Sequence, residues 1–368
     1  MKISNLRLFR YELPFVKALR MVGREHISRL GLILCLQDDD NHDGFGEIAP
    51  LPGLHKESLA QAIIQIRYLA PKLKNAPLKA EFALLDGHLS HWLEPYRLFP
   101  SVRIGIEMAT LNLLSNATGI SLCHMITQSN SLSSYLPLNG LISGTQQEIK
   151  VASTELLFEG YRTLKMKVGR QTIEEEADTV RMLRRLFGRD VAIRLDANRS
   201  WSFDRAIRFG ETISDCNVAY IEEPLMDVSR ATIFVRKTGV KIALDETLAE
   251  PNAIYREIPI ECIGAFVLKP GALGSVEKTV ELARYASEYN IPVVLSSAFE
   301  SGLSLAFYSS LAASLNATET ACGLDTYKFF KHDILLSRFK AKKGIVNVPE
   351  AYQNSRHLDW TYLEEVPL

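Results

Sequence analysis

The sequence predicts a (β/α)₈-type barrel preceded by an α+β region. Two observations carry this prediction. The first third of the chain reads as strands followed by helices, and from about residue 135 short apolar runs alternate with amphipathic helical stretches. Eight such runs recur at roughly 22–30 residues, the length of one strand–helix unit. On pattern alone an open, doubly wound sheet is the alternative to a closed barrel.

The first 50 residues predict strands. Ile27–Leu36 and Gly46–Leu51 flank the polar stretch Gln37–Gly44, which is typical of a hairpin with a long loop. Helical periodicity follows, with apolar residues on one face. The predicted helical stretches are Ser58–Leu73, Phe82–Trp92 and Ile104–Leu114.

The barrel strands are expected at the eight apolar runs. These are Leu136–Leu141, Thr163–Val168, Val191–Ala197, Val218–Ile221, Val240–Leu244, Ala265–Leu268, Pro292–Leu295 and, more weakly, Ala321–Leu324. Helices between them begin with recognisable caps. Thr172 and Glu175 form a capping box, and Ser275 begins another helix. The tail returns to turn and strand character around Gly344–Pro349.

Composition excludes several classes of protein. Forty-two basic and 43 acidic residues leave a net charge of −1, which argues against a dedicated nucleic-acid binder. No apolar run approaches the ~18–20 residues of a membrane-spanning helix, and the N-terminus lacks the apolar core of a signal peptide. Five scattered cysteines indicate reduced core residues. We therefore expect a cytoplasmic protein without nucleic-acid or membrane partners.

Five barrel strands end in charged residues, although strands buried on both faces should be apolar. Because the C-terminal ends of barrel strands converge on one face, these side chains should surround one cavity. They are, in order, Lys167, Asp196, Glu222, Asp245 and Lys269. Side chains alternate along a strand, so Lys165 points the same way as Lys167, and Arg194 the same way as Asp196 but one layer deeper.

This pattern predicts metal-assisted proton abstraction. Three neighbouring carboxylates raise one another's pKa unless a cation compensates them, and oxygen-only ligands favour Mg²⁺, with Mn²⁺ as a substitute. No histidine lies at a strand end, which argues against zinc. A lysine beside a dication and other cations has a lowered pKa and can remove a proton α to a carboxylate, giving an enediolate that the metal and Lys269 stabilise. The alternative without chemistry is a ring of ion pairs that closes the barrel.

Other candidate sites are weaker. The stretch Asp39–Gly44 looks like the start of a calcium loop, but its twelfth position is Pro50, so a polar hairpin turn is favoured. His88 and His91 lack a third ligand nearby, which favours a surface or core role.

At the strand-end charges the sequence resembles the muconate-lactonizing-enzyme subgroup of the enolase superfamily. That subgroup has Lys-x-Lys on the second strand, metal carboxylates on the third to fifth, and lysine on the sixth. The resemblance implies a modified (β/α)₇β barrel at 131–330, an α+β capping domain at 1–130 and a tail, 331–368, that returns to the capping domain. It makes Asp196, Glu222 and Asp245 metal ligands, with Glu222 chosen over Glu223 as the first acid of its run. Lys167 and Lys269 become the acid/base pair.

Three segments look most like the o-succinylbenzoate synthase family. They are Gly44–Gly53 (GFGEIAPLPG), Leu195–Trp201 (LDANRSW) and Ser296–Ser301 (SSAFES). The resemblance implies Mg²⁺-dependent dehydration of a succinyl-hydroxycyclohexadiene carboxylate to 2-succinylbenzoate, in menaquinone synthesis. Lys167 would remove the proton and then assist loss of hydroxide from the same face, while Lys269 acts electrostatically.

The same resemblance gives expectations for substrate contacts. Lys165, Arg194 and Ser297 are expected to bind a small carboxylate substrate, and loops at Arg20–Gly23 and Leu51–His55 to close over it. Gly271 departs from the subgroup, in which a bulkier or polar residue is expected. Rival activities on the same scaffold are an N-acylamino-acid racemase, a dipeptide epimerase and a lactone-forming cycloisomerase. A non-catalytic metal-stabilised binding protein is the alternative of another class.

Overall fold

The computed structural model describes residues 1–21, 23–127, 132–250, 252–315 and 317–368. Its N-terminal part is built on an antiparallel sheet with the strand order β13-β1-β2-β3. The strands are β1 (Ile3–Met21), β2 (Arg24–Asp38), β3 (Asp43–Ile48) and β13 (Glu364–Val366). The predicted hairpin is confirmed with a shorter loop, since Gln37 still pairs with Asp43. At the other edge, Val366 of the tail pairs with Leu8 of β1.

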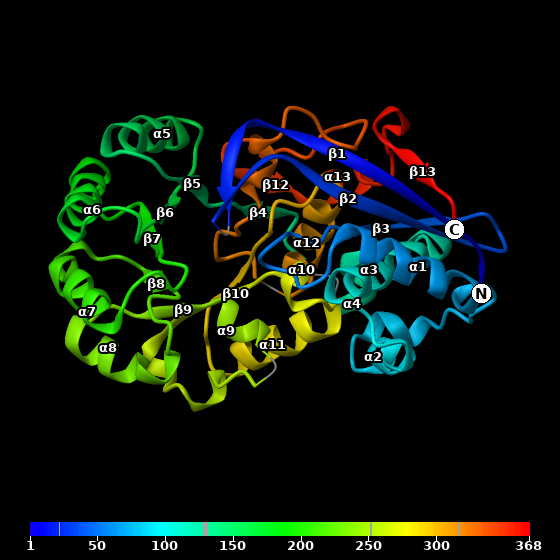
Figure 1. Cartoon of the computed structure of the whole chain (residues 1–368), viewed down its shortest axis with the longest axis horizontal. Coiled ribbons are helices and arrows are strands. Elements are labelled where there is room, and N and C mark those ends of the chain that lie inside the picture. The colour runs from blue at the N-terminus through cyan, green and yellow to red at the C-terminus, as the bar shows by residue number, and fades with distance from the viewer. Residues whose placement is uncertain (22, 128–131, 251, 316) are drawn as a thin grey trace.

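Helices cover one face of this sheet (Figure 1). They are α1 (Leu59–Leu73), η1 (Ala80–Leu84), α2 (His88–Leu93), η2 (Glu94–Tyr96), α3 (Pro100–Thr118) and α4 (Leu122–Thr127). The helix α3 lies directly on β3, where a side chain at Gly46 would overlap the carbonyl group of Gly105. The prediction of helix through Phe82–Trp92 is wrong in its middle. Leu85 and Gly87 have φ angles of 49° and 109°, and these left-handed conformations separate η1 from α2.

Seven parallel strands form the barrel, and their spatial order, β5 to β11, is their order in the sequence. This order excludes the doubly wound sheet, whose strand order reverses at a switch point. The strands are β5 (Gly140–Ile142), β6 (Thr163–Lys167), β7 (Ala192–Asp196), β8 (Tyr220–Glu222), β9 (Ile242–Leu244), β10 (Ile263–Leu268) and β11 (Val293–Leu295). Figure 1 shows the sheet curling, with the helices outside it.

The longer barrel helices follow their strands in alternation. They are α5 (Gln146–Phe158), α6 (Ile173–Phe187), α7 (Phe203–Thr212), α8 (Ala231–Thr238), α11 (Val276–Glu288) and α12 (Gly302–Ser314). Thr172 and Ser275 cap α6 and α11 as predicted. Shorter elements are η3 (Ser214–Cys216), η4 (Val228–Arg230), α9 (Glu246–Ala249), η5 (Tyr255–Glu257), η6 (Ile260–Cys262), α10 (Pro270–Leu273), η7 (Asp325–Phe329), β12 (Ile345–Asn347), α13 (Val348–Asn354) and η8 (Trp360–Tyr362). Across the described ranges, no helix has the length and apolar character needed to cross a membrane.

The eighth apolar run, Ala321–Leu324, closes the ring without forming a regular strand. The amide of Gly323 donates to the carbonyl of Leu295 at 2.8 Å, and the amide of Cys322 donates to that of Pro137 at 2.8 Å. The first apolar run, Leu136–Leu141, is divided between two sheets. β4 (Tyr135–Pro137) pairs with β12 in a small separate sheet, and only β5 joins the barrel.

Buried carboxylates join the N-terminal part to the barrel helices. Glu47 of β3 accepts hydrogen bonds from the hydroxyl groups of Ser301 and Ser304 at the start of α12, both at 2.6 Å. Glu107 of α3 accepts from the hydroxyl group of Ser275, the N-cap of α11, at 3.1 Å. A carboxylate at a helix N-terminus satisfies free N–H groups and complements the helix dipole.

A third carboxylate makes the reciprocal connection. Glu277 of α11 accepts from the backbone amides of Gly87, Leu89 and Ser90 around the start of α2, at 3.1, 3.0 and 2.7 Å. The two parts of the molecule therefore cap each other's helices.

Candidate active site

The register of the barrel strands places three predicted site residues side by side. Lys167 of β6 pairs with Asp196 of β7, and Asp196 pairs with Glu222 of β8. Each of the three is the last residue of its strand. Asp245 and Lys269 follow directly after β9 and β10, so all five predicted strand-end charges lie on the same face of the barrel.

Ammonium and carboxylate groups alternate in this cluster. Lys165 Nζ lies 2.8 Å from Asp196 Oδ2 and 2.7 Å from Glu222 Oε2. Lys167 Nζ lies 2.6 Å from the same Asp196 oxygen. Lys269 Nζ is paired with Asp245 Oδ2. Asp196 and Glu222 are fully buried, so these charges are compensated by one another rather than by water.

The electrostatics follow from this burial. Burial would lower the pKa of Lys165, but the carboxylates of Asp196 and Glu222 outweigh it and raise that pKa well above its ordinary value. Burial would raise the pKa of Asp196, but Lys165 and Lys167 hold it well below its usual range. The pKa of Lys269 is likewise raised, against the effect of burial, by Asp245 and Glu222.

The donor types fit a hard divalent cation. The three carboxylates offer oxygen atoms only and lie at the same end of the barrel, although their oxygen atoms do not all lie within 4.8 Å of one another. The ammonium groups of Lys165, Lys167 and Lys269 are paired with these carboxylates. A cation bound at the carboxylates would offset their negative charge, which is what raises the pKa of Lys165 and Lys269. The lowered lysine pKa expected from the sequence therefore depends on the cation and not on the protein alone.

Glu223 has a different role from its neighbour Glu222. Its backbone has a φ of 43°, and its carboxylate accepts from the amides of Asp245 and Thr247, both at 2.8 Å, and from Arg199 Nε at 2.8 Å. It therefore holds the backbone that carries Asp245. Sequence reasoning missed this supporting role.

Asn198 also contacts the cluster and was missed. Lys167 Nζ donates to Asn198 Oδ1 at 2.6 Å, and Asn198 Nδ2 donates to Glu246 Oε1 at 3.0 Å. Strand alternation could not place it, because β7 ends at Asp196 and Asn198 lies in the turn that follows, with a φ of 42°.

Arg194 lies one layer below Asp196, as alternation predicts, but it is directed across the barrel. Its Nη1 donates to Asn139 Oδ1 at 3.1 Å and to the carbonyl of Ala321 at 2.6 Å, and its guanidinium lies over the ring of Tyr220. These contacts span the seam between β5 and the irregular eighth run. Its predicted contact with substrate stays a prediction.

Ser297 follows β11 at the same end of the barrel. Its hydroxyl group lies 2.8 Å from Thr326 Oγ1 and 3.3 Å from the carbonyl of Gly323. It is buried, and its expected role in substrate binding also stays a prediction.

One of the two predicted closing loops can be described. Leu51–His55 reaches the barrel, since His55 Nε2 lies 3.0 Å from the carbonyl of Gly271. For the loop Arg20–Gly23, residue 22 and the side chains of residues 20 and 21 lie outside the described residues.

A second acidic group lies in the turn between β2 and β3, where Asp38, Asp40 and His42 are close enough to share a cation. The Asp38 carboxylate already accepts from the amides of Asp40 and His42, at 3.0 and 2.8 Å, and pairs with His42 Nδ1. This is the bonding of a polar hairpin turn, the interpretation that the sequence favoured.

Comparisons with known proteins agree with this architecture. Residues 149–352 match the family model described as Enolase C-terminal domain-like, and residues 3–113 match the N-terminal domain of MenC. An o-succinylbenzoate synthase of Haemophilus influenzae is 30% identical over 343 residues, covering 90% of this chain and 92% of that protein. The Arabidopsis thaliana protein PHYLLO, chloroplastic, is 31% identical over 84% of this chain, which spans only 20% of PHYLLO's length.

Solved structures show the same fold. The L-Ala-D/L-Glu epimerase of Bacillus subtilis superposes with a TM-score of 0.83 at 21% identity, covering 94% of this chain and 96% of that one. A muconate lactonizing enzyme of Pseudomonas fluorescens gives 0.82 at 18% identity, with 94% of each chain covered. The chain therefore belongs to the enolase superfamily and is a divalent-metal-dependent carbon–oxygen lyase related to the o-succinylbenzoate synthases.

Proposed function

We propose that this enzyme is an o-succinylbenzoate synthase, which dehydrates 2-succinyl-6-hydroxy-2,4-cyclohexadiene-1-carboxylate to 2-succinylbenzoate in menaquinone synthesis. The observation that carries the proposal is the match of residues 3–113 to the MenC N-terminal domain, together with o-succinylbenzoate synthases that match over nearly their whole length. It is supported by the pairing of Lys167 with Asp196 and of Lys269 with Asp245 at one end of the barrel.

Asp196, Glu222 and Asp245 would hold Mg²⁺, with Mn²⁺ as a substitute. The bound cation supplies positive charge for the substrate carboxylate oxygens, where negative charge develops when the α proton is lost. Burial of Asp196 and Glu222 keeps bulk water from screening that charge.

Lys167 would act first as a base and then as an acid. Its neutral amine takes the proton from the carbon α to the ring carboxylate, and the C–H electron pair passes into the enediolate. The C–O bond to the ring hydroxyl then breaks, and the Lys167 ammonium gives its proton to the departing hydroxide, forming water. Aromatisation of the ring favours this second step. The Lys269 ammonium stabilises the enediolate charge from the other side.

Loss of the cyclohexadiene ultraviolet absorption on adding enzyme and Mg²⁺ tests the activity directly. Lys167→Ala should abolish turnover while Mg²⁺ still binds, and Asp196→Asn should weaken Mg²⁺ binding. Turnover at the wild-type rate in Lys167→Ala would remove the proposed base.

Racemisation of acylated amino acids or dipeptides is the second candidate, favoured by the presence of a lysine on each side of the cluster. Epimerase and racemase structures share this fold. Racemisation needs both lysines, whereas dehydration from one face needs proton transfer by one. Deuterium wash-in at the α carbon, lost in Lys167→Ala and Lys269→Ala alike, would favour this candidate.

A further inference from the structure

A histidine links the N-terminal part to the chain segment that carries Lys269. The Nδ1 atom of His55 accepts a hydrogen bond from the amide of Leu51 at 2.9 Å, so the proton lies on Nε2 in the neutral ring. That Nε2–H donates to the carbonyl of Gly271 at 3.0 Å. Burial lowers the pKa of His55, which is consistent with a neutral imidazole.

Gly271 is held on two sides. It lies in α10, and carbonyl groups in the last turn of a helix lack an intrahelical partner, which His55 supplies here. A methyl group at Gly271 would overlap the Glu300 carboxylate, so that side chain closes the other side. Backbone movement at Gly271 is therefore limited by both neighbours.

The constraint extends to Lys269. Its carbonyl accepts from the amide of Leu273 at 2.9 Å, which makes Lys269 the N-cap of α10. A shift of Gly271 therefore moves the backbone from which the Lys269 ammonium reaches Asp245.

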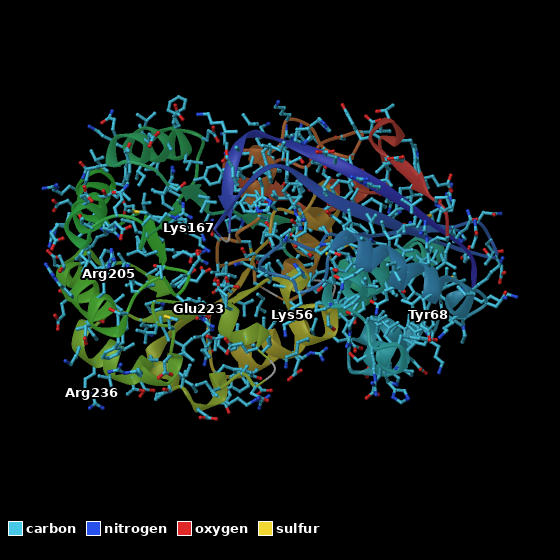
Figure 2. The ribbon with its side chains drawn as sticks, viewed as in Figure 1. Lys56, Tyr68, Lys167, Arg205, Glu223 and Arg236 are labelled. Carbon is cyan, nitrogen blue, oxygen red and sulfur yellow. The ribbon has the colours of Figure 1, made fainter. Side chains whose placement is uncertain are left out.

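Arg29 holds the residue that precedes the loop. This buried guanidinium donates to the carbonyl of Pro50 at 2.9 Å and, through Nε, to that of Phe299 at 3.2 Å. The loop thus contacts the segment after β10 through His55, and Arg29 links its start to the segment after β11. Figure 2 shows Lys56, the residue after His55, where the barrel meets the N-terminal part.

We propose that His55 is a positioning residue, whose bond to Gly271 couples the Leu51–His55 loop to the location of the Lys269 ammonium. The catalytic consequence rests on the proposed function, since it assumes that Lys269 stabilises the enediolate. The coupling of loop and lysine does not depend on it.

Two substitutions separate the two hydrogen bonds of His55. Gln places an amide N–H near the position of Nε2 and keeps a donor for Gly271. Asn places an oxygen near the position of Nδ1 and keeps only the acceptor for Leu51. Lys56→Ala, at the exposed residue directly after the loop, is the matched control.

Kinetics of the Mg²⁺-loaded variants give the first readout. His55→Asn should lower kcat/KM about tenfold, mainly through kcat, because small misplacements of a group that stabilises the transition state are costly. His55→Gln should stay within about threefold of wild type, and Lys56→Ala should match it. Equal losses in the Asn and Gln variants would overturn the proposal.

Amide hydrogen exchange gives a readout that needs no activity. His55→Asn should speed exchange in both 51–57 and 270–275, and His55→Gln should restore protection in 270–275. Unchanged protection there in His55→Asn would overturn the coupling. A wild-type enzyme that fails to dehydrate the cyclohexadiene, yet shows these exchange changes, would refute the proposed function and leave the coupling supported.

Discussion

Glu222 and Glu223 are consecutive in the chain, yet their carboxylates serve opposite sides of the strand end. Glu222 Oε2 lies 2.7 Å from Lys165 Nζ, whereas Glu223 Oε1 accepts the amide of Asp245 at 2.8 Å. Alternation along a strand already directs consecutive side chains to opposite sides. The positive φ of Glu223 lies directly after β8, and Arg199 contacts the Glu223 carboxylate in this conformation. The Glu222 carboxylate faces the cavity, whereas the Glu223 carboxylate holds the backbone of Asp245.

We therefore expect substitution of Glu222 to change mainly the Mg²⁺ affinity and substitution of Glu223 to change mainly the stability. Glu222→Gln should weaken Mg²⁺ binding at least tenfold, or about 1.4 kcal/mol, because it removes a negative charge from the cavity. Glu223→Gln should change the Mg²⁺ dissociation constant by less than about threefold but cost about 2 kcal/mol of stability, since the charge-assisted bond from Arg199 is lost. Calorimetric titration and urea unfolding measure the two effects. Equal affinity losses would contradict the division.

Arg194 predicts a structural effect. Arg194→Met keeps much of the side-chain volume but leaves Asn139 Oδ1 and the carbonyl of Ala321 without their donor inside the barrel seam. Each unsatisfied buried group costs about 1–3 kcal/mol, so urea unfolding should show a loss of at least that size. Unchanged stability with a raised KM would instead favour the substrate contact expected from the sequence.

Glu300 predicts a pH dependence of stability. Burial, with a further contribution from the nearby Glu47, raises its pKa from an ordinary value near 4.5 to about 7. The folded state therefore binds more protons than the unfolded state between these values, and its stability falls as the pH rises from about 4.5 to about 7. The full difference is about 3 kcal/mol. The pKa of Asp325 is also raised to about 7, so the variant still loses stability over this range. The fall in Glu300→Gln should be smaller than in the wild type by about 3 kcal/mol, which denaturant unfolding across the pH range measures. Parallel pH profiles would contradict the prediction.

We expect the effects on stability of substitutions at Gly271 and Glu300 to be coupled. Gly271→Ala should destabilise the protein by about 1–3 kcal/mol, because its methyl group meets the buried carboxylate. Glu300→Ala makes room, so the double variant should recover about 1 kcal/mol or more of that loss. Additive effects in the double-mutant cycle would mean that the two residues do not compete for space. Competition would explain the glycine that departs from the subgroup pattern.

Local patterns predicted the barrel and the strand-end charges because both follow from periodicity and from the convergence of strand ends. Alternation also placed Arg194 in the correct layer. It could not show that Asn139 and Ala321, far away in the chain, would lie opposite it. The break at Leu85 and Gly87 depends on two left-handed residues, and apolar periodicity carries no such information. The domain limits near 130 and 330 stay predictions.

Glu47, Glu107 and Glu277 have a consequence for how such chains diversify. Each of these acids belongs to one part of the molecule and accepts hydrogen bonds at the N-terminus of a helix in the other part. If the N-terminal part were replaced by that of a relative, the barrel helices would lose the carboxylates that cap them unless the replacement carried acidic residues at equivalent positions. Substitutions in one part at these positions therefore require matching changes in the other part.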